Sequence, residues 1–197
     1  MKEEIEMAFM DFQALLMDLD GKGKIKLDYS FNAPLEDEQA LAQMPEAIRG
    51  LYFSDGFTMT WDGLDNEVNG YWNLIAANHR EGIKQDLLDN HPGDTTILSK
   101  FVPVCFDAPE TVIGYAMDGD AVNLWSYSTN DLTPRLLGLS AFAYVSFVMN
   151  CLCVENLSDL ILNYTEDPDN YKKTLTFIEA NNPMGIEAVK ATLATLE

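Results

Sequence analysis

Positively charged side chains are scarce in this sequence. Its 197 residues include 12 Lys and Arg against 32 Asp and Glu, a formal net charge of −20. Residues 51–79 contain no Lys or Arg, and in residues 101–171 only Arg135 stands against ten carboxylates. Proteins bind nucleic-acid backbones and anionic membranes by placing Lys and Arg on the phosphates. The sequence therefore argues against direct binding of nucleic acid or of a membrane surface, and it is compatible with a basic protein partner.

Cysteine and histidine are also rare. The three cysteines Cys105, Cys151 and Cys153 cannot all pair within the chain, and the last two point to nearly opposite sides of a helix. Neither a disulfide framework nor a zinc site is predicted, so we expect buried thiols in a reducing compartment. His79 and His91 flank a polar segment and are interpreted as surface or capping residues. No metal and no cofactor are expected.

The motifs that mark common enzyme sites are missing or stand in the wrong context. The segment DGKGK at 20–24 follows a predicted helix and leads into a strand, whereas a phosphate-binding loop leads from a strand into a helix. No Gly-x-Ser-x-Gly elbow occurs. The segment Asp118-Gly119-Asp120 is too short for a calcium loop and predicts a tight hairpin turn. Carboxylates are so numerous that their spacing singles out no acid/base pair.

The least polar stretch, residues 136–154, contains no Asp, Glu, Lys, Arg or His. Its length approaches the roughly 20 apolar residues that cross a bilayer, but polar residues interrupt it and no Lys or Arg cluster flanks it. Ser140 is expected to cap a helix of about four turns inside this run. A helix that is apolar nearly all round is buried, so this helix is predicted to form the core of a soluble domain.

The remaining pattern predicts an α+β fold with a predominantly antiparallel central sheet covered by helices. Phe57, Met59 and Trp61 alternate with polar residues, as in a half-buried strand. The amino-terminal stretch carries Glu before its apolar part, unlike a secretory signal, so a cytoplasmic location is expected. Strands are expected at 24–31, 57–61, 70–77, 101–106, 112–117 and 121–127, and further helices at 3–19, 34–43, 46–53, 79–90, 171–180 and 185–196.

Acidic residues gather in the expected turns and strand ends. Trp61 leads through Asp62 into an acidic loop, and an aromatic ring beside exposed carboxylates is typical of a binding hot spot for a basic partner. The alternative interpretation places Trp61 in the core. The predicted partner-binding residues are Asp55, Trp61, Asp62, Asp65, Glu67, Asp118 and Asp120.

The stretch FNAPLEDEQALAQMPEAIRGLYFSDG resembles the opening of the SUKH superfamily, which includes fungal cell-wall assembly regulators and bacterial toxin-immunity proteins. That family shows a Pro turn, a short acidic helix, a Leu-Pro step and a helix that ends in Asn-Gly. Here Pro34, Met44-Pro45 and Asp55-Gly56 take those places, with Met for Leu and Asp for Asn.

Two later segments carry the same resemblance. In FVPVCFDAPETVIGYAMDGDAVNLWSYSTND, Pro103 and Asp107 stand where the family has a strand with Pro and then Asp. The run LSAFAYVSFVMNCL is similar to its closing helix. The resemblance predicts a single SUKH-like domain over 1–197, with a core at about 31–155 and a C-terminal helical extension at 156–197.

The resemblance implies a non-enzymatic binding domain without a cofactor. In bacteria such proteins are immunity factors that block a toxin, often a nuclease or a deaminase. The acidity agrees, because an inhibitor of a nucleic-acid enzyme must face a basic cleft. Two alternatives stay open: a SUKH-type scaffold or regulatory adaptor without a toxin partner, and an enzyme or small-ligand binder that uses a cleft in the sheet.

Overall fold

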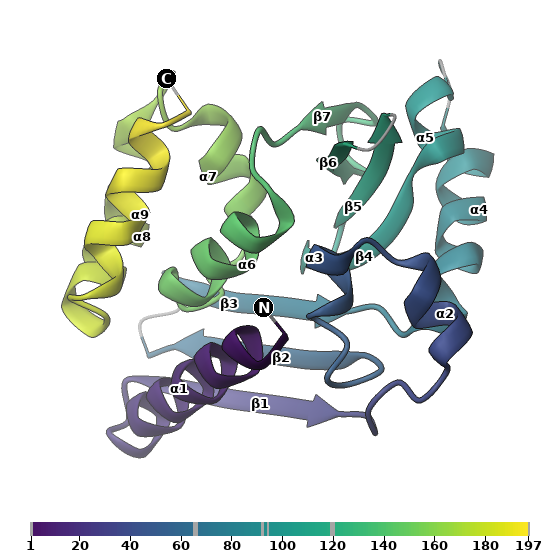
Figure 1. Cartoon of the computed structure of the whole chain (residues 1–197). Helices are drawn as coiled ribbons and strands as arrows, with labels where there is room; N and C mark the ends of the chain where they lie inside the picture. The colour runs from purple at the N-terminus through teal and green to yellow at the C-terminus, as the bar shows by residue number, and fades with distance from the viewer. Residues whose placement is uncertain (1, 65–66, 92, 94, 119–120, 197) are drawn as a thin grey trace.

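A computed structural model describes residues 2–64, 67–91, 93, 95–118 and 121–196, and every structural statement below concerns these residues. The fold is α+β, as predicted, with a seven-stranded antiparallel sheet whose strands follow one another in chain order (Figure 1). The strands are β1 Ile25–Phe31, β2 Phe57–Gly63, β3 Asn69–Leu74, β4 Val102–Ala108, β5 Thr111–Asp118, β6 Ala121–Ser128 and β7 Pro134–Leu136.

The sheet bends sharply in its middle. β1, β2 and β3 pair along most of their length, whereas β3 and β4 share two register pairs, Asn73 with Phe106 and Leu74 with Cys105. The pairing ends just beyond β3, where the Ile75 amide donates to the Val104 carbonyl at 2.9 Å. β4 also shifts register twice against β5, and such irregularities bend a strand. The result is two parts, β1–β3 and β4–β7, set at an angle to each other (Figure 1).

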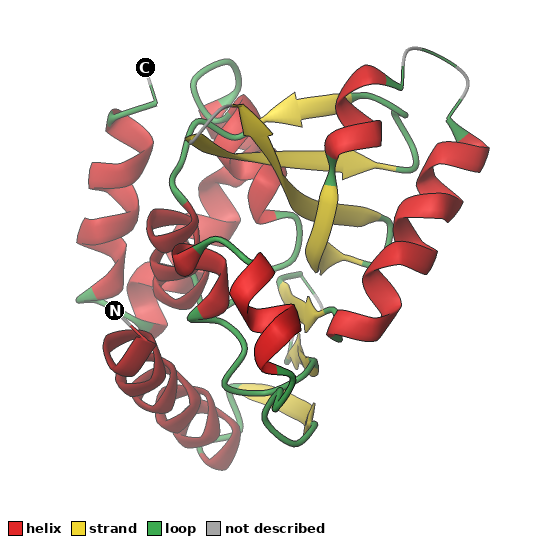
Figure 2. Cartoon of the chain, turned by 45° about the vertical axis from the view of Figure 1, so that its right-hand side comes forward, coloured by secondary structure: helices red, strands yellow, loops and turns green. Residues whose placement is uncertain are grey.

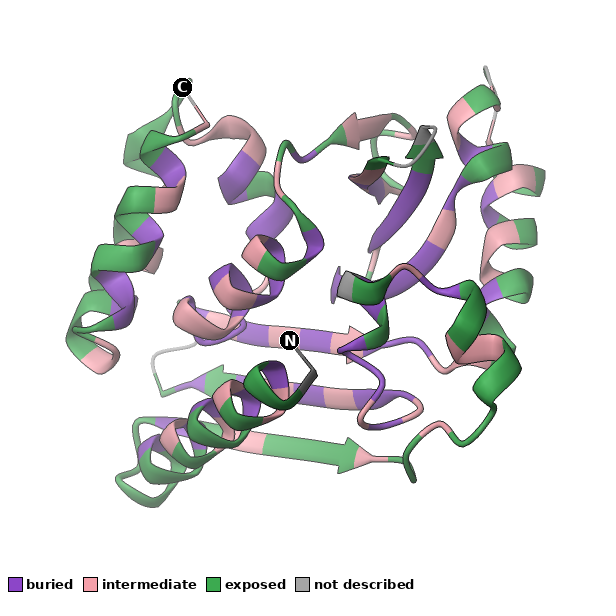
Figure 3. Ribbon diagram, viewed as in Figure 1, coloured by how far each residue is buried: buried purple, intermediate pink, exposed green. Residues whose placement is uncertain are grey.

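The inner face of β1–β3 is covered by helix α1 (Lys2–Gly21) and by α6 (Ala141–Asn150). Phe57, Met59 and Trp61 on β2 are buried on this face, while the two threonines between them are half-buried, and β2 shows this alternation in Figure 3. The ring of Phe9 lies 5.3 Å from that of Phe57. α1 contributes a buried line at regular helical spacing: Ile5, Phe9, Phe12, Leu16 and Leu19.

The opposite face of β4–β6 is covered by α4 (Arg80–Asn90) and α5 (Thr96–Lys100), as Figure 2 shows. Leu87, Leu98 and Phe101 pack there against Val112 of β5. The Phe101 ring also lies directly on Gly114 of β5. Only glycine fits there, because a Cβ at position 114 would lie 2.4 Å from the Phe101 ring. β4 and β5 are buried at most successive positions, so both of their faces are covered, whereas β6 and β7 stay partly exposed.

The apolar run at 136–154 forms a shorter helix than expected. Leu136 ends β7, and α6 begins after Ser140, whose Oγ accepts a hydrogen bond from the Ala143 amide at 3.2 Å. The predicted cap is confirmed. The burial is confirmed in part, because one face of α6 is buried while Phe142 is 46% exposed. Leu152 and Cys153 adopt positive φ values of 58° and 46°, so the chain leaves the helix instead of continuing to 154. Within the described ranges, no helix combines the length and the apolarity that a bilayer crossing needs.

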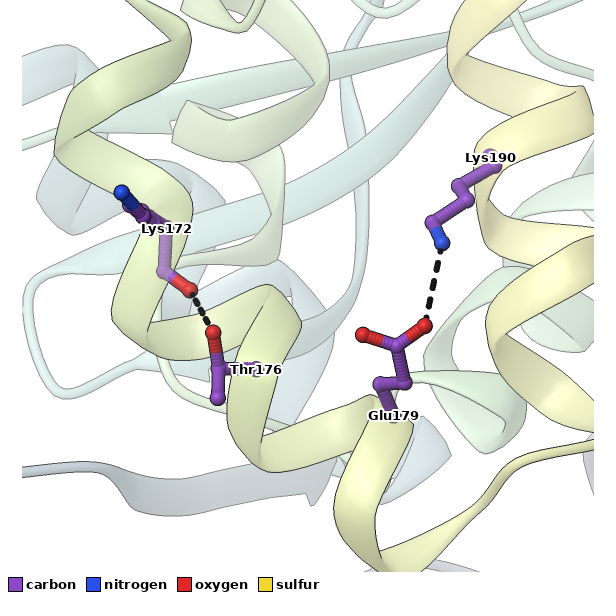
Figure 4. Close-up of polar contacts among 4 residues, drawn as sticks. All are labelled: Lys172, Thr176, Glu179 and Lys190. Atoms are coloured by element: carbon purple, nitrogen blue, oxygen red, sulfur yellow. Dashed lines mark hydrogen bonds and ion pairs between the residues drawn. The ribbon is translucent and has the colours of Figure 1, made fainter.

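The C-terminal helices pack on the same core. Phe177 stacks on Trp61 with ring centroids 5.1 Å apart, and Ile178 is fully buried. Figure 4 shows Lys190 bonded to Glu179 at 3.3 Å, which links two of these helices at the surface. The elements are α7 Leu157–Asn163, the 3₁₀ turn η2 Pro168–Tyr171, α8 Lys172–Asn181 and α9 Gly185–Ala194.

Several boundaries differ from the sequence-based expectation. The helix expected at 34–43 begins later, as α2 (Glu38–Gln43), because Asp37 accepts hydrogen bonds from the amides of Gln39 and Ala40. The helix expected at 46–53 is the single turn α3 (Glu46–Arg49). The strand expected to reach residue 77 ends at Leu74, before the 3₁₀ turn η1 (Ala77–His79). α5, α7 and β7 were not predicted.

Candidate functional site

A polar cavity of about 270 Å³ lies where the β4–β5 turn, the β6–β7 connection and the start of α7 meet. Three carboxylates and one guanidinium share its lining with hydroxyl and amide groups. We call it the carboxylate cavity. Its lining residues are Glu110, Thr111, Ser126, Ser128, Asn130, Asp131, Thr133, Arg135, Asn156, Ser158, Asp159 and Leu162.

Local hydrogen bonds fix the two carboxylates that come from turns. The Thr129 amide donates to the carbonyl of Glu110 at 2.9 Å, which ties the β4–β5 turn to the β6–β7 connection. Asn130 Nδ2 lies 3.4 Å from the Glu110 carboxylate. Asp131 Oδ1 accepts from the Thr133 amide at 3.0 Å, an arrangement that lets Asp shape its own turn. Asp131 is therefore fixed by its own turn, whereas Glu110 is placed by its backbone and its carboxylate has one long contact.

The third carboxylate, Asp159, belongs to a hydrogen-bond network that links α7 to Arg135 of β7. Arg135 Nη2 donates to Asn163 Oδ1 at 2.6 Å, and Asn163 Nδ2 donates to Asp159 Oδ1. Tyr171 donates its hydroxyl to Asp159 Oδ2 at 2.6 Å. Burial and this hydrogen bond raise the pKa of Tyr171, so the hydroxyl stays a donor. Arg135 is bonded here to a neutral amide and not to a carboxylate. The lining as a whole carries three carboxylates against one guanidinium.

A buried carboxylate, Asp107 of β4, adjoins the cavity through its backbone partners. Its Oδ2 accepts from the Ser158 amide at 2.7 Å, and its carbonyl accepts from the Asn156 amide at 2.9 Å. Asp107 thereby caps α7 from another element, because Asn156 has a positive φ of 62° and makes no side-chain cap. Its Oδ1 has no hydrogen-bond partner within the described structure. Burial raises the pKa of Asp107 to about 6, although the hydrogen bonds from Ser158 lower it.

The structure corrects the predicted contact role of Trp61. Its side chain is 1% exposed, and its Nε1 donates to the carbonyl of Leu152 at 2.8 Å. Phe177 covers one side of the indole, and Gly70 lies against it. A partner has no access to this side chain, so the alternative core interpretation is the right one. The alternating pattern of β2 indicated a buried face without showing that C-terminal helices cover it.

The three other predicted contact residues whose side chains are described, Asp55, Asp62 and Glu67, lie in two different parts of the fold. Asp62 and Glu67 are exposed beside the β2–β3 turn, where Lys173 Nζ lies 2.9 Å from Glu67 Oε1. Asp55 is half-buried and accepts from the Ala77 amide at 2.8 Å. Asp118 ends β5, and in an antiparallel meander the β2–β3 and β5–β6 turns lie at opposite ends of the strands. The structure does not describe the side chains of three predicted residues: Asp65, Asp118 and Asp120.

Sequence reasoning missed the carboxylate cavity. Glu110, Asp131 and Asp159 are far apart in the chain, and each is an ordinary turn or helix-end residue in its local context. The consecutive strand order brings the β4–β5 turn beside the β6–β7 connection. α7, which carries Asp159, was not predicted. The available signal was Arg135, the single basic residue in a long acidic stretch.

Comparisons with protein-family models, with curated proteins and with solved structures find no match to this chain. The resemblance to the SUKH superfamily therefore stays a prediction. In the part of the chain that the structure describes, no three His, Cys, Asp or Glu side chains are grouped so as to hold a metal ion. The cavity presents negatively charged and polar groups.

Proposed function

We propose that this chain is a non-enzymatic protein-binding domain of the immunity type, which neutralises a basic toxin domain in the cytoplasm. The observation that supports this proposal best is the carboxylate cavity, with three carboxylates against one guanidinium. Pockets for drug-sized ligands hold about 300–1,000 Å³, so a cavity just below that range suits one side chain of a partner better than a free ligand. An Arg or Lys of the toxin is the matching occupant.

The geometry favours a guanidinium or an ammonium group. Asp131 and Asp159 already accept hydrogen bonds at 3.0 and 2.6 Å, so these two side chains lose little freedom when a partner binds. Hydrogen bonds between an ionised donor and a carboxylate are roughly twice as strong as neutral ones. Arg135 offsets only one of the three negative charges, so the lining keeps a net negative charge. Hydroxyl and amide groups of the lining supply further acceptors.

The net charge of the whole chain supports the same role at longer range. A formal charge of −20 attracts a basic partner before contact and repels acidic ones. A nuclease or a deaminase binds nucleic acid in a basic cleft, and an acidic protein seated there excludes the substrate. Inhibition then needs no chemical step on the part of this chain.

Rescue of cells that express the toxin encoded beside this gene tests the proposal. The cavity variant removes three charges without changing side-chain size: E110Q/D131N/D159N. We expect wild type to protect the cells and the cavity variant to lose protection while it stays folded. A scaffold or adaptor without a toxin partner would give no protection even as wild type, and that result would reject the immunity role.

A control variant removes the same number of charges elsewhere. Glu36, Glu81 and Glu187 are exposed, lie outside the cavity lining and stand before α2, in α4 and in α9. The variant E36Q/E81Q/E187Q should protect cells as wild type does. Equal loss in both variants would show that total charge, and not the cavity, carries the interaction.

A further inference from the structure

Helix α1 carries a second apolar stripe on its solvent side. Met7 and Met10 are each 67% exposed, Met17 is 50% exposed, and Ala14 between them is exposed as well. Positions 7, 10, 14 and 17 follow a spacing of three and four residues, which forms one line along a helix. This methionine stripe lies nearly opposite the buried line of α1, so the packing of the domain does not use it.

An apolar cavity of about 400 Å³ opens next to this stripe. Three aromatic rings line it, those of Phe9, Phe31 and Phe53, and Met10 belongs to both the cavity and the methionine stripe. Phe9 stands 5.7 Å from Phe31 and 4.6 Å from Phe53 between ring centroids, so the aromatic lining is one connected cluster. The cavity is wide enough for a large apolar side chain of another protein.

The charges around the methionine stripe select among the possible occupants. Glu3 and Asp11 are exposed on α1, and Glu6 stands in the cavity lining. Asp18, also exposed, is paired with Lys22. A second copy of this chain would bring the same carboxylates face to face, which is unfavourable. An anionic lipid surface meets the same repulsion. A basic segment is attracted instead.

We propose that the methionine stripe and the aromatic cavity form a docking surface for a basic amphipathic segment of a partner protein. Methionine side chains are flexible and polarizable, and they adapt to varied apolar surfaces. The apolar face of the segment covers the stripe and places one large side chain in the cavity, while its Lys and Arg meet the carboxylates. The surface is distinct from the carboxylate cavity. It shares with the proposed function only the basic character of the partner.

Fluorescence anisotropy with the full-length protein tests this surface. The probe is a labelled peptide of about 18 residues, built from Leu, Phe and Lys with its apolar residues at helical spacing. A scrambled peptide of the same composition is the control. We expect the amphipathic peptide to bind about tenfold more tightly, since a tenfold ratio corresponds to only about 1.4 kcal/mol of apolar contact. Equal affinity for both peptides would show attraction by charge alone and would overturn the proposal.

Substitution of the stripe gives a second test. M7Q/M10Q/M17Q keeps α1 helical and replaces only exposed side chains, so the fold is retained. It should weaken the amphipathic peptide about tenfold and leave the scrambled peptide unchanged. If the variant instead dissociates a dimer seen by sedimentation of wild type, the stripe is a self-association surface and the proposal is wrong.

The proposals for the two sites can be rejected independently of each other. E110Q/D131N/D159N should bind the amphipathic peptide with wild-type affinity, because its substitutions lie outside α1 and the aromatic cavity. Loss of toxin protection with intact peptide binding therefore concerns the carboxylate cavity alone. Intact protection together with no preference for the amphipathic peptide overturns the docking surface alone.

Discussion

The indole of Trp61 lies directly on Gly70, so closely that a Cβ added to Gly70 would come within 2.0 Å of Trp61 Nε1. The two residues face each other across β2 and β3 in the sheet register. The same indole donates to the Leu152 carbonyl after α6 and stacks on Phe177 of α8. One side chain thus joins the sheet, the turn after the central helix and the C-terminal helices.

Gly70→Ala should destabilise the protein by about 2–3 kcal/mol or prevent folding, because an extra methyl group must displace a buried indole. Urea denaturation gives the free energy of unfolding. Gly82→Ala in α4 is the matched control, since a Cβ there meets no atom within 4 Å. It should raise stability by about 0.5–1 kcal/mol through helix propensity. Equal stability of both variants would contradict the described packing around Trp61.

Trp61→Ala should lower the free energy of unfolding by about 3–5 kcal/mol, the usual loss for a large buried aromatic side chain. Because Phe177 loses its stacking partner, amide exchange in α8 should accelerate more than exchange in α4. Chemical denaturation and hydrogen exchange measure both effects. A stable variant that binds its partner poorly would restore the contact role that the sequence suggested.

Asp107 should make stability depend on pH between about 4 and 6. Burial raises the pKa of Asp107 from the ordinary Asp value of 3.8, which applies to the unfolded chain, to about 6 in the folded protein. The folded state therefore binds this proton more tightly than the unfolded state. Acidification from pH 7 to 4.5 should therefore add stability, on the order of 2 kcal/mol from this residue. Asp107→Asn lacks this contribution and should gain less on acidification. Urea denaturation at a series of pH values gives the free energy of unfolding of both proteins. If this free energy changes with pH equally in wild type and in Asp107→Asn, the assigned role of Asp107 is wrong.

Local patterns predicted most of the fold. The apolar spacing of α1, the alternation of β2, the β5–β6 hairpin and the Ser140 cap depend on neighbours within a few residues, and the structure confirms them. The start of α7 escaped prediction because its cap is Asp107, about fifty residues away, and because Asn156 adopts a positive φ. Short helices set by distant partners leave little trace in the local sequence.

The candidate site was less predictable than the fold. Trp61 looked like an exposed hot spot because the helices that cover it come more than a hundred residues later. Glu110 and Asp131 line one cavity because β5 and β6 return the chain to the same end of the sheet. In a chain with 32 carboxylates, composition predicts an acidic surface but not which carboxylates share a site. Strand order supplies that information.

The most direct test is the affinity of the full-length protein for a basic toxin domain of the proposed class, measured at low and at physiological salt. Wild type should bind more weakly at about 200 mM than at about 50 mM salt, because screening reduces the attraction between charged surfaces. E110Q/D131N/D159N should bind more weakly at low salt and show a flatter salt dependence, whereas E36Q/E81Q/E187Q should keep tight binding at low salt. An affinity of wild type that does not change with salt, or the same affinity for the cavity variant as for wild type, would contradict the proposed role of the carboxylate cavity.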